Sequence, residues 1–228
     1  MLTKKKSISK KEIKEDTLVT SYYKFVQFFS EYKSKIYLYA GIVVAAAVAV
    51  YFYSSYNSTR NDKAELELSK VMALYDAGAY QEAINGRAAA NIPGLQKIVD
   101  EYGSTESGET AKLYLANCYN MLGKFDEALK YYDSYSGDND VFEASALAGK
   151  AGCLEAKGDF EKAASLYKEA ANVSKSNALN SDYLLNSGVD YLEAGKKEAA
   201  REVLEKIKED YKTSMASREA ERYLVQVK

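Results

Sequence analysis

The chain has 228 residues, a net charge of −2 and no histidine. Histidine is the commonest general base and metal ligand, and two cysteines cannot form a four-thiolate zinc site, so the composition argues against catalysis and against a structural metal. Residues 1–59 carry nine lysines against four acids, whereas residues 60–228 carry 22 Lys and Arg against 29 acids. An acidic main body lacks the clustered basic face that phosphate binding needs, so we expect no nucleic-acid partner.

The first expected element is an amphipathic helix within a basic N-terminal tail, residues 1–35. Apolar side chains recur there at helical spacing, and lysines occupy other parts of the helix surface. Such a helix either lies on the anionic inner leaflet of a membrane or packs against another membrane protein, and the sequence leaves both open. The apolar positions are Leu18, Tyr22, Val26, Phe29 and Tyr32.

Residues 36–53, IYLYAGIVVAAAVAVYFY, form a run of eighteen residues without a charge. As a helix this run rises about 27 Å, close to the hydrocarbon thickness of about 30 Å. Tyrosines stand at both ends and Lys33 and Lys35 precede the run, so the positive-inside rule predicts a single-pass anchor with a cytoplasmic N-terminus and an exported body. Two alternatives stay open: a signal peptide cleaved at Ala47-Val48-Ala49, and a buried core helix.

A polar linker is expected over residues 54–61, and residues 62–228 are predicted to form repeated helix pairs. A small residue on each helix lets the backbones approach, and a glycine five residues earlier ends the preceding helix in a left-handed turn. One pair cannot bury its own apolar faces, so the pairs must stack, and MASREAERYLVQV at the end is predicted as a capping helix. The aligned residues are Ala83, Ala128, Ala163 and Ala200, with Gly78, Gly123, Gly158 and Gly195.

The stretch AKLYLANCYNMLGKFDEALKYY resembles the tetratricopeptide repeat, a helix-turn-helix unit of about 34 residues. The resemblance covers most of residues 62–228, with the first copy interrupted near GRAAANIPG before LQKIVDEYG resumes. It implies an all-α fold: an N-terminal amphipathic helix and a single transmembrane helix, then a solenoid of about four helix pairs with a C-terminal capping helix.

The combination of a lysine-rich tail, one span and an exported tetratricopeptide domain is similar to the bacterial ancillary subunit of the Sec translocon. This resemblance implies a place in the bacterial inner membrane with the repeat domain in the periplasm. The implied partners are Sec translocon subunits, a periplasmic peptidyl-prolyl isomerase and unfolded secreted clients. We expect no cofactor and no small-molecule substrate. The alternative is a scaffold that docks one dedicated partner in another cell-envelope complex.

Family geometry further implies a concave groove lined by the first helices of the pairs. Its lining is largely apolar and contains adaptable methionines, so it could hold an extended or helical peptide unless neighbouring repeats or the cap cover it. The predicted lining residues are Leu68, Met72, Leu113, Asn117, Met121, Ala148, Leu185, Val189 and Leu192.

Reactive patterns in the repeat region are better explained by packing. Ser165 and Lys168 match the S-x-x-K pattern of serine acyl enzymes, but the motifs that accompany it are absent. Cys118 and Cys153 occupy equivalent positions in successive first helices, whose axes lie about 8–10 Å apart, whereas a disulfide needs Cα atoms within about 7 Å. Two buried thiols are therefore expected, and the protein is not expected to be an enzyme.

Overall fold

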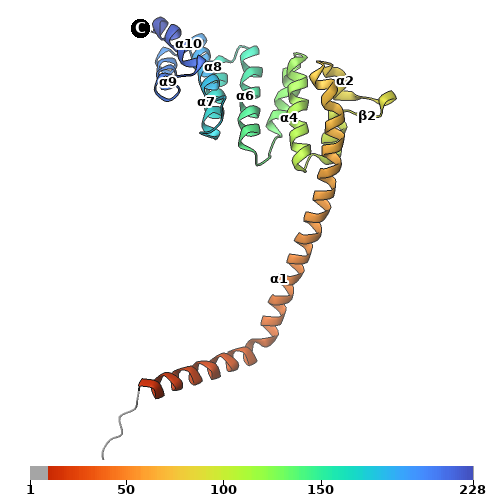
Figure 1. Ribbon diagram of the computed structural model, residues 1–228, viewed down its shortest axis with the longest axis vertical. Helices are drawn as coiled ribbons and strands as arrows, with labels where there is room; N and C mark the ends of the chain where they lie inside the picture. Colours follow the sequence, from red (N-terminus) through yellow and green to blue (C-terminus); the bar gives the residue numbers. More distant parts are fainter. Residues whose placement is uncertain (1–9, 228) are drawn as a thin grey trace, which may run out of the picture. The chain divides into compact units, whose positions relative to one another are not determined.

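The computed structural model describes the backbone of residues 10–227 and the side chains of residues 19–226, so the first nine residues of the predicted tail lie outside it. The described chain is all-α apart from one very short hairpin, and it divides into two units, Met1–Tyr56 and Asn57–Lys228. The elements labelled in Figure 1 and those between them are α1 (Lys10–Asp76), α2 (Tyr80–Asn85), β1 (Gly86–Arg87), η1 (Ala88–Ala90), β2 (Ile92–Pro93), α3 (Leu95–Tyr102), α4 (Glu106–Met121), α5 (Phe125–Asp133), α6 (Asp140–Ala156), α7 (Phe160–Val173), α8 (Asn180–Glu193), α9 (Lys197–Asp210), α10 (Met215–Leu224) and η2 (Val225–Val227).

Helix α1 contains the predicted span without interruption. Its described part, Val19–Asp76, is long and apolar enough to cross a membrane by length and composition. None of its most apolar window is buried, and the side chains of residues 37–53 are exposed. The buried core helix is therefore wrong as an alternative, and a helix of this kind fits a membrane anchor or a signal sequence.

The segment 54–61, predicted as a linker, is helical within α1. Its second half packs in the repeat unit. The Asn61 side chain accepts a hydrogen bond from the Ser107 N–H at 2.8 Å, and the Arg60 guanidinium lies 5.8 Å from the centre of the Tyr102 ring. The linker prediction is thus corrected for residues 57–61, because the helix continues into the first repeat and contacts the end of α3 and the first turn of α4.

The predicted glycine turns and alanine contacts are confirmed. At Gly123, φ is +73°, and the N–H of the following Lys124 donates to the Tyr119 carbonyl at 2.9 Å, which closes the end of α4. The equivalent turns have φ between +71° and +81°, and the four aligned alanines have no exposed surface. The turn residues are Gly78, Gly123, Gly158 and Gly195, and the alanines are Ala83, Ala128, Ala163 and Ala200.

The interruption of the first repeat is a small β-hairpin whose end returns to the end of α2. β1 pairs antiparallel with β2. A Cβ added at Gly94 would lie only 2.2 Å from the Ile84 carbonyl oxygen, so the chain returns to the end of α2 before α3 begins. Tyr131 on α5 donates to Gln96 on α3 at 2.7 Å. We conclude that α2 and α3 together take the place of one second helix.

The core runs along the stack as three successive clusters of buried side chains. The first joins α1 to α4, the second joins α4 to α6, and the third joins α6 to α10. Helix α4 serves two clusters, with Leu115 in the first and Leu113 in the second. Each pair therefore completes its core with the next, as a one-dimensional repeat array requires.

Large side chains cross from one pair to the next. Tyr132 of α5 is 3% exposed, and a Cβ added at Gly149 of α6 would lie 2.3 Å from its Cζ. The stack ends at α10, where Ala216 and Ala220 are buried and the intervening Arg218 and Glu219 are exposed. This polar outer face confirms the predicted capping helix.

Candidate protein-binding surfaces

Two residues of the predicted groove belong to the core. Leu68 is 8% exposed within the first cluster and Leu113 is 6% exposed within the second. Their assignment to a peptide-binding surface is wrong, because neighbouring helices already cover them.

Asn117 is held inside the stack as a bridge between two tyrosines. Its amide nitrogen donates to the Tyr75 hydroxyl at 3.4 Å, and its carbonyl oxygen accepts from the Tyr132 hydroxyl at 2.5 Å. The Tyr75 ring also meets the Tyr114 ring edge to face, with centroids 4.9 Å apart. Asn117 on α4 therefore links α1 to α5, and both its amide nitrogen and its carbonyl oxygen bond to other side chains of the protein.

The remaining predicted groove residues differ in exposure. Met121, at the end of α4, is 61% exposed. Ala148 and Leu185 are half-buried against the third cluster, and Met72 is half-buried against the first. Val189 and Leu192 of α8 are also half-buried. Met121 thus offers the most accessible apolar side chain of the nine.

A surface depression that the sequence reasoning missed lies between α5, α6 and α7. It has a volume of about 730 Å³ and is lined by three half-buried leucines, Leu129, Leu154 and Leu166. Two ion pairs stand on its rim, Lys150 with Asp133 at 2.5 Å and Lys162 with Asp159 at 2.6 Å. No local sequence pattern marks these three leucines as neighbours. The depression combines apolar contact with both signs of charge. The depression residues are Leu129, Asp133, Lys150, Leu154, Asp159, Glu161, Lys162, Ser165 and Leu166.

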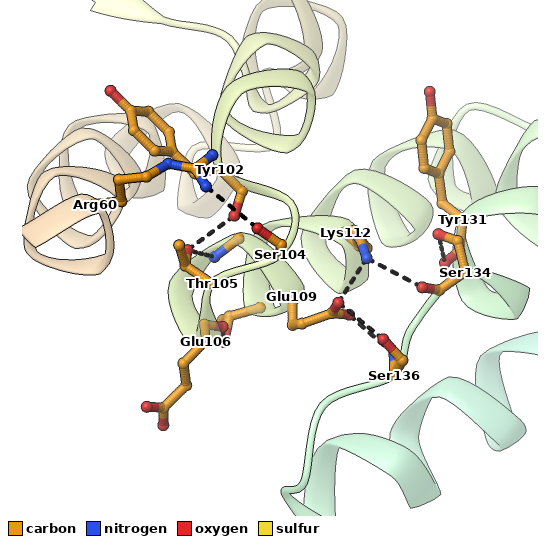
Figure 2. A network of polar contacts seen from close by, with 12 residues as sticks. Arg60, Tyr102, Ser104, Thr105, Glu106, Glu109, Lys112, Tyr131, Ser134 and Ser136 are labelled. Atoms are coloured by element: carbon orange, nitrogen blue, oxygen red, sulfur yellow. Dashed lines mark hydrogen bonds and ion pairs between the residues drawn. The ribbon is translucent and has the colours of Figure 1, made fainter. Parts of the chain in front are cut away.

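A second depression, of about 870 Å³, lies between the start of α4 and the loop that joins α5 to α6. Figure 2 shows the polar network along its wall. The Glu109 carboxylate pairs with Lys112 at 2.6 Å and accepts from the Ser136 N–H at 2.9 Å and the Ser136 hydroxyl at 3.0 Å. Lys112 also donates to the Ser134 carbonyl at 3.2 Å. The Glu109–Lys112 pair is largely buried, and its hydrogen bonds hold the loop between α5 and α6 against α4. We therefore assign this network a structural role.

Replacing Glu109 with alanine should lower the free energy of unfolding by about 2 kcal/mol, because the Lys112 charge stays buried without its partner and the loop loses two hydrogen bonds. Urea unfolding of the full chain in detergent measures this. Glu106→Ala is the control: its exposed side chain points away from the network in Figure 2, and its loss should cost no more than about 0.5 kcal/mol. Equal losses in the two variants would contradict the structural role of Glu109.

The described side chains include one strongly perturbed carboxyl group, Asp190 on α8. It is 2% exposed, and its Oδ2 atom has no hydrogen-bond partner. Burial, reinforced by the charges of Glu155 and Glu193, raises the pKa of Asp190 to about 7. Tyr167 donates to Glu155 at 3.2 Å, and burial together with the Glu155 charge raises the pKa of that tyrosine. Because burial raises this pKa towards neutrality, we expect the stability of this part of the stack to depend on pH.

The suspected reactive groups are engaged elsewhere. The Ser165 hydroxyl donates to the Glu161 carbonyl at 3.0 Å, and the Lys168 ammonium donates to Glu202 at 2.9 Å, so the two do not form a nucleophile and base pair. Cys118 and Cys153 are free thiols without exposed surface, as expected. Burial raises the pKa of Cys118 to about 12 and that of Cys153 to about 11. Among the described residues, no group of three Cys, Asp or Glu side chains is arranged to hold a metal ion.

A family model described as tetratricopeptide repeat matches residues 110–136 and 182–214. The first range covers most of α4 and all of α5, and the second covers most of α8 and all of α9. No curated protein matches the chain. The chain therefore carries tetratricopeptide repeats next to a long apolar N-terminal helix, and repeats of this kind indicate protein binding.

Proposed function

We propose that this is a single-pass protein of the bacterial inner membrane whose periplasmic repeat domain binds unfolded secreted proteins beside the Sec translocon. The observation that carries the proposal is the joining, in one chain, of tetratricopeptide repeats to an exposed apolar helix of membrane-spanning length. The partners would be translocon subunits, a periplasmic peptidyl-prolyl isomerase and the clients themselves. We assign the protein no catalytic role.

The charge distribution supports the proposed orientation. Nine lysines stand before residue 60 against four acids, whereas the rest of the chain has an excess of acids. Basic residues near a span stay in the cytoplasm, which puts the N-terminus inside and the repeat domain outside.

Two surfaces are candidates for client contact. The depression between α5, α6 and α7 has a leucine floor and paired charges on its rim, which suits short extended segments of varied sequence. Met121 is the accessible part of the predicted groove, and its flexible side chain adapts to different shapes. Weak apolar contacts of this kind favour many clients over one.

Photo-crosslinking in living cells tests the proposal. A photoreactive residue replaces Met121 for the groove or Lys162 for the depression, and Glu219 on the exposed face of α10 is the control position. Asn117 is avoided, because the substitution would break its bonds to Tyr75 and Tyr132.

Adducts with translocon subunits and a spread of secreted proteins at Met121 or Lys162, with few at Glu219, are the expected result. One envelope protein captured at high yield would replace the chaperone-like role with a scaffold for a dedicated complex. Equal capture at all three positions would contradict binding at either surface.

A further inference from the structure

The first part of α1 presents an aromatic face that the repeat domain does not explain. All described side chains of residues 19–35 are exposed, including bulky aromatic ones; Phe25 is 66% exposed and Tyr22 is 64% exposed. Exposed rings at this density are unusual in a helix surrounded by water, because large apolar patches mark surfaces that contact something else.

Four of the six rings in residues 19–35 lie on one side of the helix, and Tyr23 and Phe28 lie on its flanks. At 3.6 residues per turn, Tyr22, Phe25, Val26, Phe29 and Tyr32 fall within an arc of about 120°. The opposite arc of about 80° carries polar side chains only. Those polar residues are Thr20, Lys24, Gln27, Glu31 and Ser34.

The aromatic face is continuous with the start of the apolar span. The Phe25 and Phe29 rings stack with centroids 6.5 Å apart, and Phe29 meets Tyr37 edge to face at 6.1 Å. Tyr37 is the second residue of the apolar run, so a membrane that holds the run also lies next to this face. The Lys35 ammonium lies 5.8 Å from the Tyr32 ring centre, with its charge beside that ring.

Charge and side-chain type indicate what the aromatic face contacts. Residues 1–35 hold nine lysines and four acids, which complements an anionic lipid leaflet. Tyrosine combines an apolar ring with a polar tip, which suits the boundary between headgroups and acyl chains. A helix that packs in a protein bundle would instead be expected to carry mainly Leu, Ile and Val on its contact face.

We propose that the face formed by Tyr22, Phe25, Val26, Phe29 and Tyr32 binds the surface of an anionic bilayer leaflet. The rings enter the headgroup boundary, and Lys33, which lies within the same arc, and Lys35 contact lipid phosphates. The segment acts as a second membrane attachment beside the span, on its cytoplasmic side. This inference rests on the proposed anchoring of the chain.

Spin labelling of the full chain in vesicles tests it. Single labels are placed by Phe25→Cys and Phe29→Cys on the aromatic face, Gln27→Cys and Glu31→Cys on the opposite face, and Val44→Cys in the span. The native Cys118 and Cys153 are fully buried, and unsubstituted protein treated with the label measures any background from them. Vesicles are phosphatidylcholine with or without phosphatidylglycerol, and collisions with oxygen and with a water-soluble nickel chelate report immersion.

With phosphatidylglycerol present, labels at 25 and 29 should collide more with oxygen and less with nickel than labels at 27 and 31, and this contrast should weaken without it. Equal nickel access at all four positions in both kinds of vesicle, with position 44 immersed, would overturn the inference and assign the face to a protein partner, leaving the anchor intact. Nickel access at position 44 would overturn the anchor and with it the lipid-bound face.

Discussion

Gly108→Ala should lower the free energy of unfolding by about 3 kcal/mol, the largest loss that we expect from a single added methyl group in this chain. A Cβ at residue 108 would lie 1.8 Å from the Tyr102 carbonyl oxygen and 2.4 Å from its carbon. Both are backbone atoms at the end of α3, so no side-chain rotation relieves the clash. The same residue donates its N–H to the Thr105 hydroxyl that caps α4, at 3.1 Å. Moving α4 away would therefore also break its cap.

Gly152→Ala in α6 is the matched control. Its Cβ would meet the Tyr167 hydroxyl at 3.5 Å, an ordinary contact, and alanine favours a helix over glycine by about 0.5–1 kcal/mol. Urea unfolding of the full chain in detergent, followed by circular dichroism, should show a lower midpoint for the first variant and a higher one for the second. A Gly108→Ala midpoint equal to that of the unsubstituted protein would contradict the close approach of α3 and α4.

Asp190→Asn should stabilise the protein at alkaline pH by a few kcal/mol, up to about 4. The pKa of Asp190 is raised from 3.8 to about 7 by burial and by the charges of Glu155 and Glu193. Between these values the folded state keeps a proton that the unfolded state has released. The contribution of Asp190 to stability is therefore greatest below about pH 4 and falls as pH rises towards about 7. Asparagine removes the ionisation and with it this loss.

Unfolding midpoints measured from about pH 5 to about pH 8 check this prediction. The two proteins should differ least at the acidic end and most at the alkaline end. Asp182→Asn, an exposed substitution on the same helix, should leave the pH dependence unchanged. Parallel pH profiles for the Asp190 variant and the unsubstituted protein would show that this carboxyl group is not the source of the pH sensitivity.

The repeat architecture could be predicted because its determinants are local. Left-handed turns favour glycine, and close helix contacts need a small residue. The spacing of five residues between Gly123 and Ala128 therefore predicted a turn followed by a helix contact. The interruption after α2 was visible as a break in this period. The same reasoning failed at residues 57–61, where polar residues suggested a linker but tertiary contacts at Arg60 and Asn61 continue the helix into the first pair.

The binding surface could not be predicted in the same way. A helical period gives the side of a helix on which a residue lies, but the exposure of Leu113 depends on α5 and α6 covering it. The depression lined by Leu129, Leu154 and Leu166 is likewise formed by three helices, and no sequence pattern predicts that Leu129 and Leu166 lie close together. Groove and depression are therefore products of stacking geometry.

The sequence by itself determined the apolar run, the charge asymmetry, the helix pairs and the capping helix, because each depends on residues within a few turns of one another. Only the tertiary structure decided which polar groups are buried. Glu109 is fixed by Ser136, twenty-seven residues away, and Asp190 is buried near the charge of Glu155 on another helix. Desolvation and ion pairing depend on distances in space, and spacing along the chain does not set those distances for helices in different repeats.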